Sequence, residues 1–110
     1  KYDVLVFNDQ ARANSFNCGF STDDSSYTGI GPLATTTPEA ADGSPAWTRT
    51  AMPGPSSYVL ATSIPDGTDF YVRWLTDDFS GSGSRHEIGI DNIEITAVTY
   101  PVELQTFTID

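Results

Sequence analysis

The chain has 110 residues, of which 15 are acidic and 5 are basic, so its formal net charge is −10. This length supplies one domain with a single hydrophobic core. Five scattered basic residues cannot form the cationic face that binds many phosphates, so we expect no nucleic-acid partner. The longest apolar run falls far short of the roughly 20 residues that cross a bilayer, and we expect no membrane span. Because no signal segment is visible, we expect mature or internal sequence.

Cysteine and histidine each occur once, as Cys18 and His86. The alternation around Cys18 places it on the same strand face as Phe16 and Phe20, which predicts an inert core thiol. His86 lies where a loop meets a strand, and we expect it on the surface. Nucleophilic catalysis needs a base beside the nucleophile, and these two positions do not indicate such a pair. The sequence therefore predicts that the protein is not an enzyme.

Short alternating segments without a helical stripe predict strands throughout the chain. In chain order the expected strands are 2–7, 15–20, 27–30, 47–52, 58–61, 70–75, 88–98 and 102–109. Turn signals fall between them at 21–26, 53–55 and 65–67, and loops are expected over 31–45 and 77–85. Seven or eight short strands of this spacing predict an all-β fold, a jelly-roll-like antiparallel β-sandwich.

The alternation changes phase inside the segment 88–98. Ile88 and Ile90 share one phase, whereas Ile93 and Ile95 share the other. A shift of one residue turns every later side chain to the opposite face unless a bulge absorbs it. We therefore predict a β-bulge at residues 91–92.

Several stretches carry a resemblance to a known kind of module: they are 8–16, 20–23, 46–50, 70–74 (FYVRW) and 81–93 (GSGSRHEIGIDNI). They resemble the jelly-roll β-sandwich accessory module of secreted and cell-surface multidomain proteins that bacteria export by type IX secretion. The resemblance covers roughly residues 1–97 and lacks the first strands of the family. It implies a non-catalytic domain on the bacterial cell surface.

The end of the chain resembles the junction that follows such modules. The motif Pro-Val-Glu-Leu begins at Pro101 and resembles the linker ahead of a further domain. We therefore expect a β-sandwich module over 1–98, and a linker and end strand over 99–110. Two roles are open for the strand 102–109: it packs on its own sandwich, or it adds to the edge of a neighbouring subunit.

The resemblance also implies a calcium ion near the last strand, held by an acid at the position of Asp91. Ca²⁺ takes six to eight oxygen ligands, and Asp77 and Asp78 are its expected companions. The alternative is that Asp91 accepts a hydrogen bond from a loop or pairs with Arg73 or Arg85. No EF-hand spacing accompanies these residues.

Glycan binding needs exposed aromatic rings and nearby groups that bind hydroxyls. Tyr71 lies opposite the expected core face of its strand, and Trp47 and Arg49 lie on another strand; these three are the candidate ligand-binding residues. The alternatives remain open, since Trp47 also suits a core and Arg49 also suits a structural pair with a carboxylate. The sequence thus predicts a binding or adhesion module that contacts glycans. The alternative function is a structural subunit of a surface filament or adhesin, held by β-strand exchange.

Overall fold

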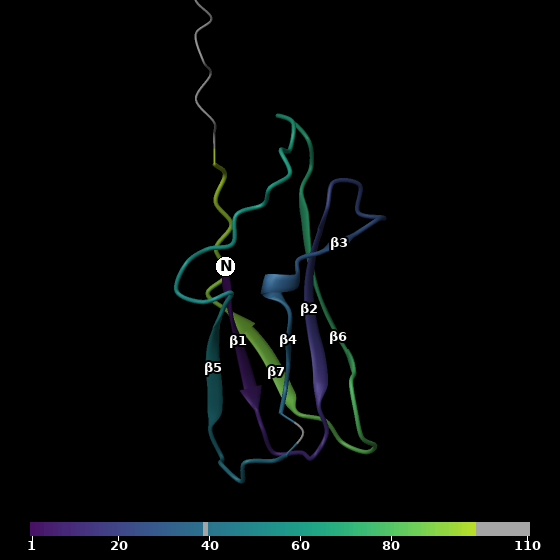
Figure 1. Cartoon of the computed structure of the whole chain (residues 1–110), viewed down its shortest axis with the longest axis vertical. Coiled ribbons are helices and arrows are strands. Elements are labelled where there is room, and N and C mark those ends of the chain that lie inside the picture. Colours follow the sequence, from purple (N-terminus) through teal and green to yellow (C-terminus); the bar gives the residue numbers. More distant parts are fainter. Residues whose placement is uncertain (39, 99–110) are drawn as a thin grey trace, which may run out of the picture.

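The computed structural model describes residues 1–38 and 40–98, which form two antiparallel sheets packed face to face (Figure 1). The elements are β1 (Tyr2–Phe7), β2 (Asn14–Ser21), β3 (Thr28–Gly29), the 3₁₀ turn η1 (Gly31–Leu33), β4 (Thr35–Thr36), β5 (Trp47–Met52), β6 (Tyr71–Asp78) and β7 (Glu87–Asp91). The expected all-β sandwich is therefore confirmed. In the described ranges no helix is long and apolar enough to cross a membrane.

The first sheet has the strand order β5-β1-β7. Its central strand β1 places Val4 opposite Thr50 of β5 and Ile90 of β7. Successive side chains of a strand point to opposite faces. The buried residues Tyr2 and Val4 therefore face the second sheet, and the intervening residues of β1 face away from it.

The second sheet is built around β2. One edge of β2 pairs with β6 along its whole length, and the other edge pairs with the two short strands β3 and β4. Phe16 and Cys18 of β2 are buried against the first sheet, as the alternation predicts. Opposite Cys18, the β6 residue Trp74 packs against the same core.

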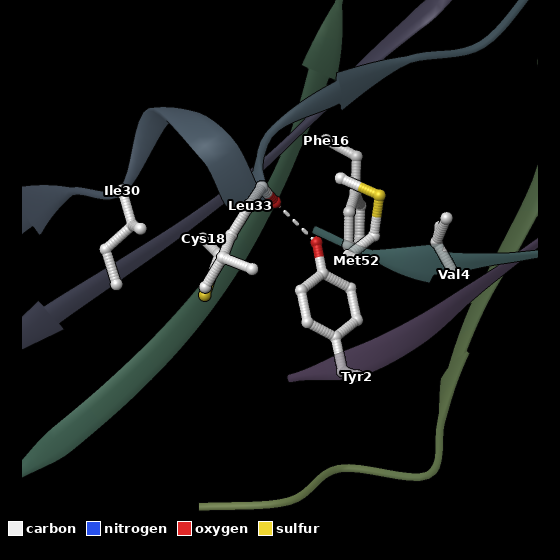
Figure 2. Packing of buried hydrophobic residues seen from close by; sticks show 7 residues of the cluster. All are labelled: Tyr2, Val4, Phe16, Cys18, Ile30, Leu33 and Met52. Atoms are coloured by element: carbon white, nitrogen blue, oxygen red, sulfur yellow. Dashed lines mark hydrogen bonds between the residues drawn. The ribbon is translucent and has the colours of Figure 1, made fainter. Parts of the chain in front are cut away.

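The core joins both sheets with the η1 turn (Figure 2). The Tyr2 hydroxyl donates a hydrogen bond to the Leu33 carbonyl oxygen at 2.6 Å. The Trp74 ring lies edge-on to Tyr2 with a centroid distance of 5.6 Å. Burial of the phenol raises the pKa of Tyr2 to about 12, because the charged form loses its hydration.

The turn predicted over 21–26 is present. Oδ1 of Asp23 accepts hydrogen bonds from the backbone N–H groups of Ser25 and Ser26 at 2.9 and 2.8 Å. These bonds favour the ionised carboxylate and lower the pKa of Asp23. Beyond the turn, Thr28 and Gly29 of β3 pair with β2, so the turn joins the two strands expected over 15–20 and 27–30 into an antiparallel hairpin.

Two expected segments differ in the structure. Residues 58–61 do not form a strand, because no strand of the described ranges pairs with them and Val59 is 62% exposed. The expected loop 31–45 contains η1 and β4, and Thr35 of β4 pairs with Phe16. A short apolar run forms a strand only where a neighbouring strand accepts its backbone hydrogen bonds.

The segment expected as one strand over 88–98 ends as a regular strand at Asp91. Asp3 pairs with Asp91, but the backbone of Lys1 bonds with that of Glu94, so one extra residue lies on the later segment. Asn92 adopts φ 50° at this point. The extra residue predicted at 91–92 is therefore present as a bulge. The end strand 102–109 and the junction at Pro101 lie outside the described residues.

Candidate functional site

The outer face of the first sheet carries two of the three residues expected to bind ligand. Each outward residue of β1 has one partner on β5 and one on β7. The three rows are Trp47–Phe7–Glu87, Arg49–Leu5–Gly89 and Ala51–Asp3–Asp91. We call these nine residues the outer face. The structure thus brings Trp47 and Arg49 together with Asp91, which the sequence had placed in a different site.

Trp47 presents an aromatic surface at one end of the outer face. Its side chain is 49% exposed, so the core alternative for this residue is wrong. The register places it opposite Phe7, and the two rings have a centroid distance of 5.6 Å at an interplanar angle of 52°. Contact with Phe7 restrains the indole, about half of which remains exposed to solvent.

Arg49 is the centre of a polar network across the outer face. Its Nη1 lies 2.8 Å from Oδ2 of Asp3, and its Nη2 lies 2.9 Å from Oδ2 of Asp91. The side-chain amide of Asn92 donates a further hydrogen bond to Asp3 at 2.8 Å. The guanidinium is therefore fixed by two carboxylates, which confirms that Arg49 pairs with acids.

These contacts change the ionisation of the network. Hydrogen bonds from Asn92 and Arg49 lower the pKa of Asp3. The pKa of Asp91 is lowered by a bond from the backbone N–H of Asn92 and by Arg49. Bonds to the two carboxylates raise the pKa of Arg49. All three groups are therefore charged at neutral pH, and Asp91 pairs with Arg49 instead of the arginines expected from the sequence.

The middle row of the outer face is open at Gly89. A Cβ atom added at Gly89 would meet no atom within 4 Å. Beside it, Leu5 contributes an apolar side chain between Gly89 and Arg49. The outer face thus combines a flat aromatic and apolar surface with a guanidinium and carboxylates. Such a surface can stack on a planar or ring-shaped ligand and bind its hydroxyl groups.

Tyr71, the third expected ligand-binding residue, lies on the other sheet. It pairs with Ser21 on β2, and its hydroxyl lies 3.4 Å from Oδ2 of Asp69. Two residues along β6, the Arg73 guanidinium carbon lies 3.7 Å from the centroid of the Tyr27 ring. The structure therefore does not bring Tyr71 together with Trp47 and Arg49.

The three expected calcium ligands occupy two places. Asp91 is the last residue of β7, whereas Asp77 and Asp78 end β6 near the first residue of β7. Asp77 and Asp78 are paired with β2, so their expected position in a Gly/Ser loop is wrong. Among the described residues no three metal-ligating side chains form a cluster.

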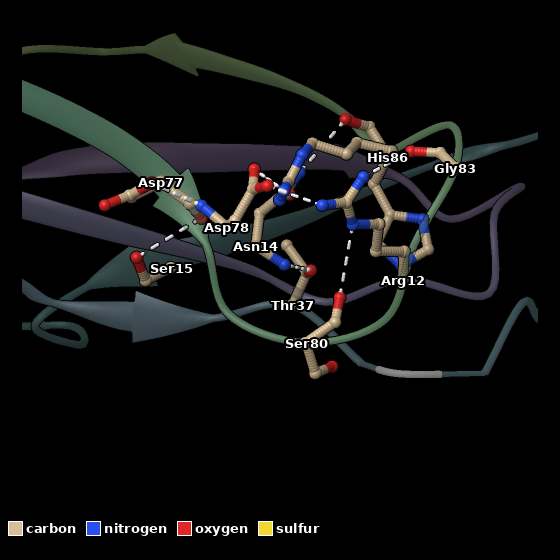
Figure 3. Close-up of polar contacts among 10 residues, drawn as sticks. Arg12, Asn14, Ser15, Thr37, Asp77, Asp78, Ser80, Gly83 and His86 are labelled. Atoms are coloured by element: carbon tan, nitrogen blue, oxygen red, sulfur yellow. Dashed lines mark hydrogen bonds and ion pairs between the residues drawn. The ribbon is translucent and has the colours of Figure 1, made fainter.

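Arginine side chains already pair with two of these carboxylates, Asp78 (Figure 3) and Asp91. Arg12 and Arg85 both form ion pairs with Asp78, and Arg49 pairs with Asp91. The second oxygen of Asp91 accepts the backbone N–H of Asn92 at 2.8 Å. A cation bound at either place would have to displace a guanidinium.

His86 is buried, with an exposed fraction of 5%, so its expected surface position is wrong. Nε2 lies 2.8 Å from the Pro38 carbonyl oxygen, and Nδ1 accepts the backbone N–H of Gln10 at 3.3 Å. The carbonyl of His86 accepts a bond from the Asn14 amide. The ring therefore links the backbone at Gln10 to the backbone at Pro38, two loops that lie far apart in the chain.

Six of the nine residues of the outer face were not site candidates from the sequence: Asp3, Leu5, Phe7, Ala51, Glu87 and Gly89. The alternation along 2–7 places Phe7 on the face opposite Tyr2 and Val4, so its outward orientation could have been predicted. No local sequence pattern placed Glu87 and Gly89 beside Phe7, because the register between β1, β5 and β7 joins residues far apart in the chain. Comparisons with protein-family models, with curated proteins and with solved structures found no match to this chain.

Proposed function

We propose that the protein is a non-catalytic binding module that contacts a glycan through the outer face. The observation that carries the proposal is the half-exposed Trp47 ring, held against Phe7 on the same face of the sheet as the fixed guanidinium of Arg49. An aromatic ring stacks on the apolar face of a sugar, and charged groups beside it bind the hydroxyls.

The charged residues of the outer face suit this ligand class. Arg49 donates from a fixed position, and Glu87 offers an acceptor in the same row as Trp47. Gly89 adds no side chain to this part of the face, and a Cβ atom placed there would meet no atom within 4 Å. A surface of this kind is shallow, so it favours an extended polymer chain over a small molecule enclosed in a cavity.

The proposal of a binding module is supported by the state of the residues that could act in catalysis. Cys18 is buried, and burial raises the pKa of its thiol, which disfavours the reactive thiolate. Both ring nitrogens of His86 are engaged by backbone groups. Within the described residues these two side chains therefore serve the fold.

A secreted or cell-surface location is part of the same proposal. It is supported by the net charge of −10, which favours solubility outside the cell, and by the resemblance to modules of bacterial type IX secretion. Adhesion to a surface polymer is the corresponding role.

The test is binding of the full chain to a panel of immobilised polysaccharides. Trp47→Ala removes the exposed ring, and Tyr71→Ala is the matched control because it removes an aromatic ring from the other sheet. We expect binding that falls roughly five- to tenfold with Trp47→Ala and persists with Tyr71→Ala, since the lost stacking is worth about 1 to 1.5 kcal/mol. Equal affinities for the two variants would contradict the proposal.

Calcium remains a prediction from the resemblance, and it has its own test. The melting temperature of the chain is measured with EDTA and with added calcium, for wild type and for Asp91→Asn. A calcium-dependent rise that is lost in Asp91→Asn supports a site at Asp91. An unchanged melting temperature in both chains argues against it.

A further inference from the structure

Glu87 is an exposed acid of the outer face that has no cationic partner in the chain. The basic residues all lie within the described ranges: Lys1, Arg12, Arg49, Arg73 and Arg85. Four of them pair with other acids, and the guanidinium of Arg73 lies over the Tyr27 ring. The carboxylate of Glu87 is therefore available to a cation from outside the chain.

The register of the first sheet explains why Arg49 does not compensate this charge. The guanidinium of Arg49 lies between Asp3 and Asp91, at 2.8 and 2.9 Å from their Oδ2 atoms. Glu87 lies in the row at the opposite end of the outer face. The outer face thus carries three carboxylates and one guanidinium, and this excess of negative charge attracts cations and repels anions.

Two aromatic rings lie in the same row as Glu87. Phe7 of β1 pairs with Trp47 of β5 on one side and with Glu87 of β7 on the other. Neighbouring strands are about 4.8 Å apart, so the Trp47 and Glu87 side chains flank that of Phe7. Trp47 is 49% exposed and its ring contacts Phe7. An exposed indole and an uncompensated carboxylate therefore border the same part of the surface.

This combination suits an ammonium group. A cation within about 6 Å of an aromatic centroid is attracted by the ring face, most strongly by that of tryptophan. A carboxylate accepts charge-assisted hydrogen bonds from the N–H groups of the same cation. A calcium ion is a poorer match, because it takes six to eight oxygen ligands and this row supplies a single carboxylate.

From these observations we propose that the row Trp47–Phe7–Glu87 is a subsite for the ammonium group of an amino sugar. The sugar ring stacks on Trp47, and its ammonium group lies between the indole and the Glu87 carboxylate. The inference rests on glycan binding by the outer face and names the class of sugar: a polymer whose units carry free amino groups. An N-acetylated sugar lacks the charge, and the surplus carboxylates repel uronic and sulfated sugars.

The test is calorimetric titration of the full chain with two oligosaccharides of equal length. One is a β-1,4-linked glucosamine oligomer, at a pH at which its amines are protonated, and the other is its fully N-acetylated counterpart. We expect wild type to bind the free-amine oligomer roughly threefold or more tightly than the N-acetylated one, because only the amine gains the contacts with the ring face and the carboxylate.

Two variants of equal charge separate the subsite from the general attraction of an acidic protein. Glu87→Gln is expected to weaken binding of the free-amine oligomer roughly two- to fivefold and to leave binding of the N-acetylated oligomer unchanged. Asp66→Asn is the matched control, because Asp66 is an exposed acid in the turn between β5 and β6 and forms no ion pair. It should bind both oligomers as wild type does.

The outcomes distinguish this inference from glycan binding itself. The inference is overturned if wild type binds the two oligomers equally, or if Glu87→Gln and Asp66→Asn bind the free-amine oligomer equally. In both cases binding that is weakened by Trp47→Ala leaves the outer face as a glycan-binding surface. If neither oligomer binds but another polysaccharide binds through Trp47, the ammonium subsite alone is wrong. If no saccharide binds, both proposals are wrong.

Discussion

Arg49 on β5 reaches across β1 to Asp91 on β7, with Nη2 2.9 Å from Oδ2 of the carboxylate. The contact joins the two edge strands of the first sheet on its outer side. It also holds the guanidinium beside the row of Asp3 and Asp91, whereas Trp47 lies in the row at the other end of the outer face, so a ligand must extend along the face to meet both. The same residue therefore serves the fold and the proposed binding surface.

Acid is expected to remove the stabilising effect of this network. The pKa values of Asp3 and Asp91 lie below the ordinary value of 3.8, so their charged forms stabilise the folded state above that pH. This stabilisation is lost as the pH falls through the lowered values. We expect wild type to melt at a higher temperature than Arg49→Gln near neutral pH. The difference should shrink from about pH 4 to about pH 2.

Melting curves of both chains across this range test the prediction. Asp23→Asn is the control, because Asp23 also has a lowered pKa but makes its contacts within the turn 21–26. The change in melting temperature caused by Asp23→Asn should be the same in wild type and in Arg49→Gln. A difference between wild type and Arg49→Gln that does not depend on pH would contradict the role of the two carboxylates.

Alkaline pH is expected to destabilise the folded protein through ionisation of Tyr2. Its folded-state pKa of about 12 lies above the ordinary value of 10.0, so the neutral phenol is favoured in the folded protein. The stability it contributes is complete below pH 10.0 and is lost as the pH rises toward about 12. In Tyr2→Phe this loss is absent, although the variant is less stable at neutral pH by about 1 to 2 kcal/mol because the Leu33 carbonyl loses its donor.

Chemical denaturation of both chains at neutral and alkaline pH measures this effect. The stability gap between wild type and Tyr2→Phe should narrow as the pH rises from 10.0, since only wild type has the buried ionisable phenol at this position. A gap that stays constant would show that the Tyr2 hydroxyl is not buried as described.

His86→Phe is expected to destabilise the fold without affecting ligand binding. The substitution leaves the Pro38 carbonyl and the Gln10 N–H without their partner, which costs about 1 to 3 kcal/mol. Thermal unfolding measures the loss, and polysaccharide binding by the folded fraction should match wild type. A wild-type melting temperature would contradict the structural role of the ring.

The strands were largely predictable because alternation is a local property of the sequence. Residues 2–7 and 47–52 became β1 and β5, and Cys18 is buried on the predicted face. The segment 58–61 has the same local signal but no neighbouring strand, so it remains irregular. Strand propensity describes fit to a sheet and does not say whether a partner is present.

The candidate site was only partly predictable. Trp47 and Arg49 were identified as residue types suited to sugars, but their meeting with Phe7 and Asp91 depends on the register of three strands. His86 could not be placed, because its burial depends on bonds to Pro38 and Gln10, which lie far from it in the chain. The contacts of these residues therefore depend on long-range pairing, which the local sequence pattern does not specify.

The most direct test of glycan binding by the outer face uses the indole N–H signals in NMR spectra. The chain has two tryptophans, and Trp47→Phe assigns their two signals. On titration with a polysaccharide fragment from the panel, we predict that the Trp47 signal shifts while that of Trp74, which packs against the core, stays in place. A titration that shifts neither signal, or shifts Trp74 alone, would contradict binding at this face.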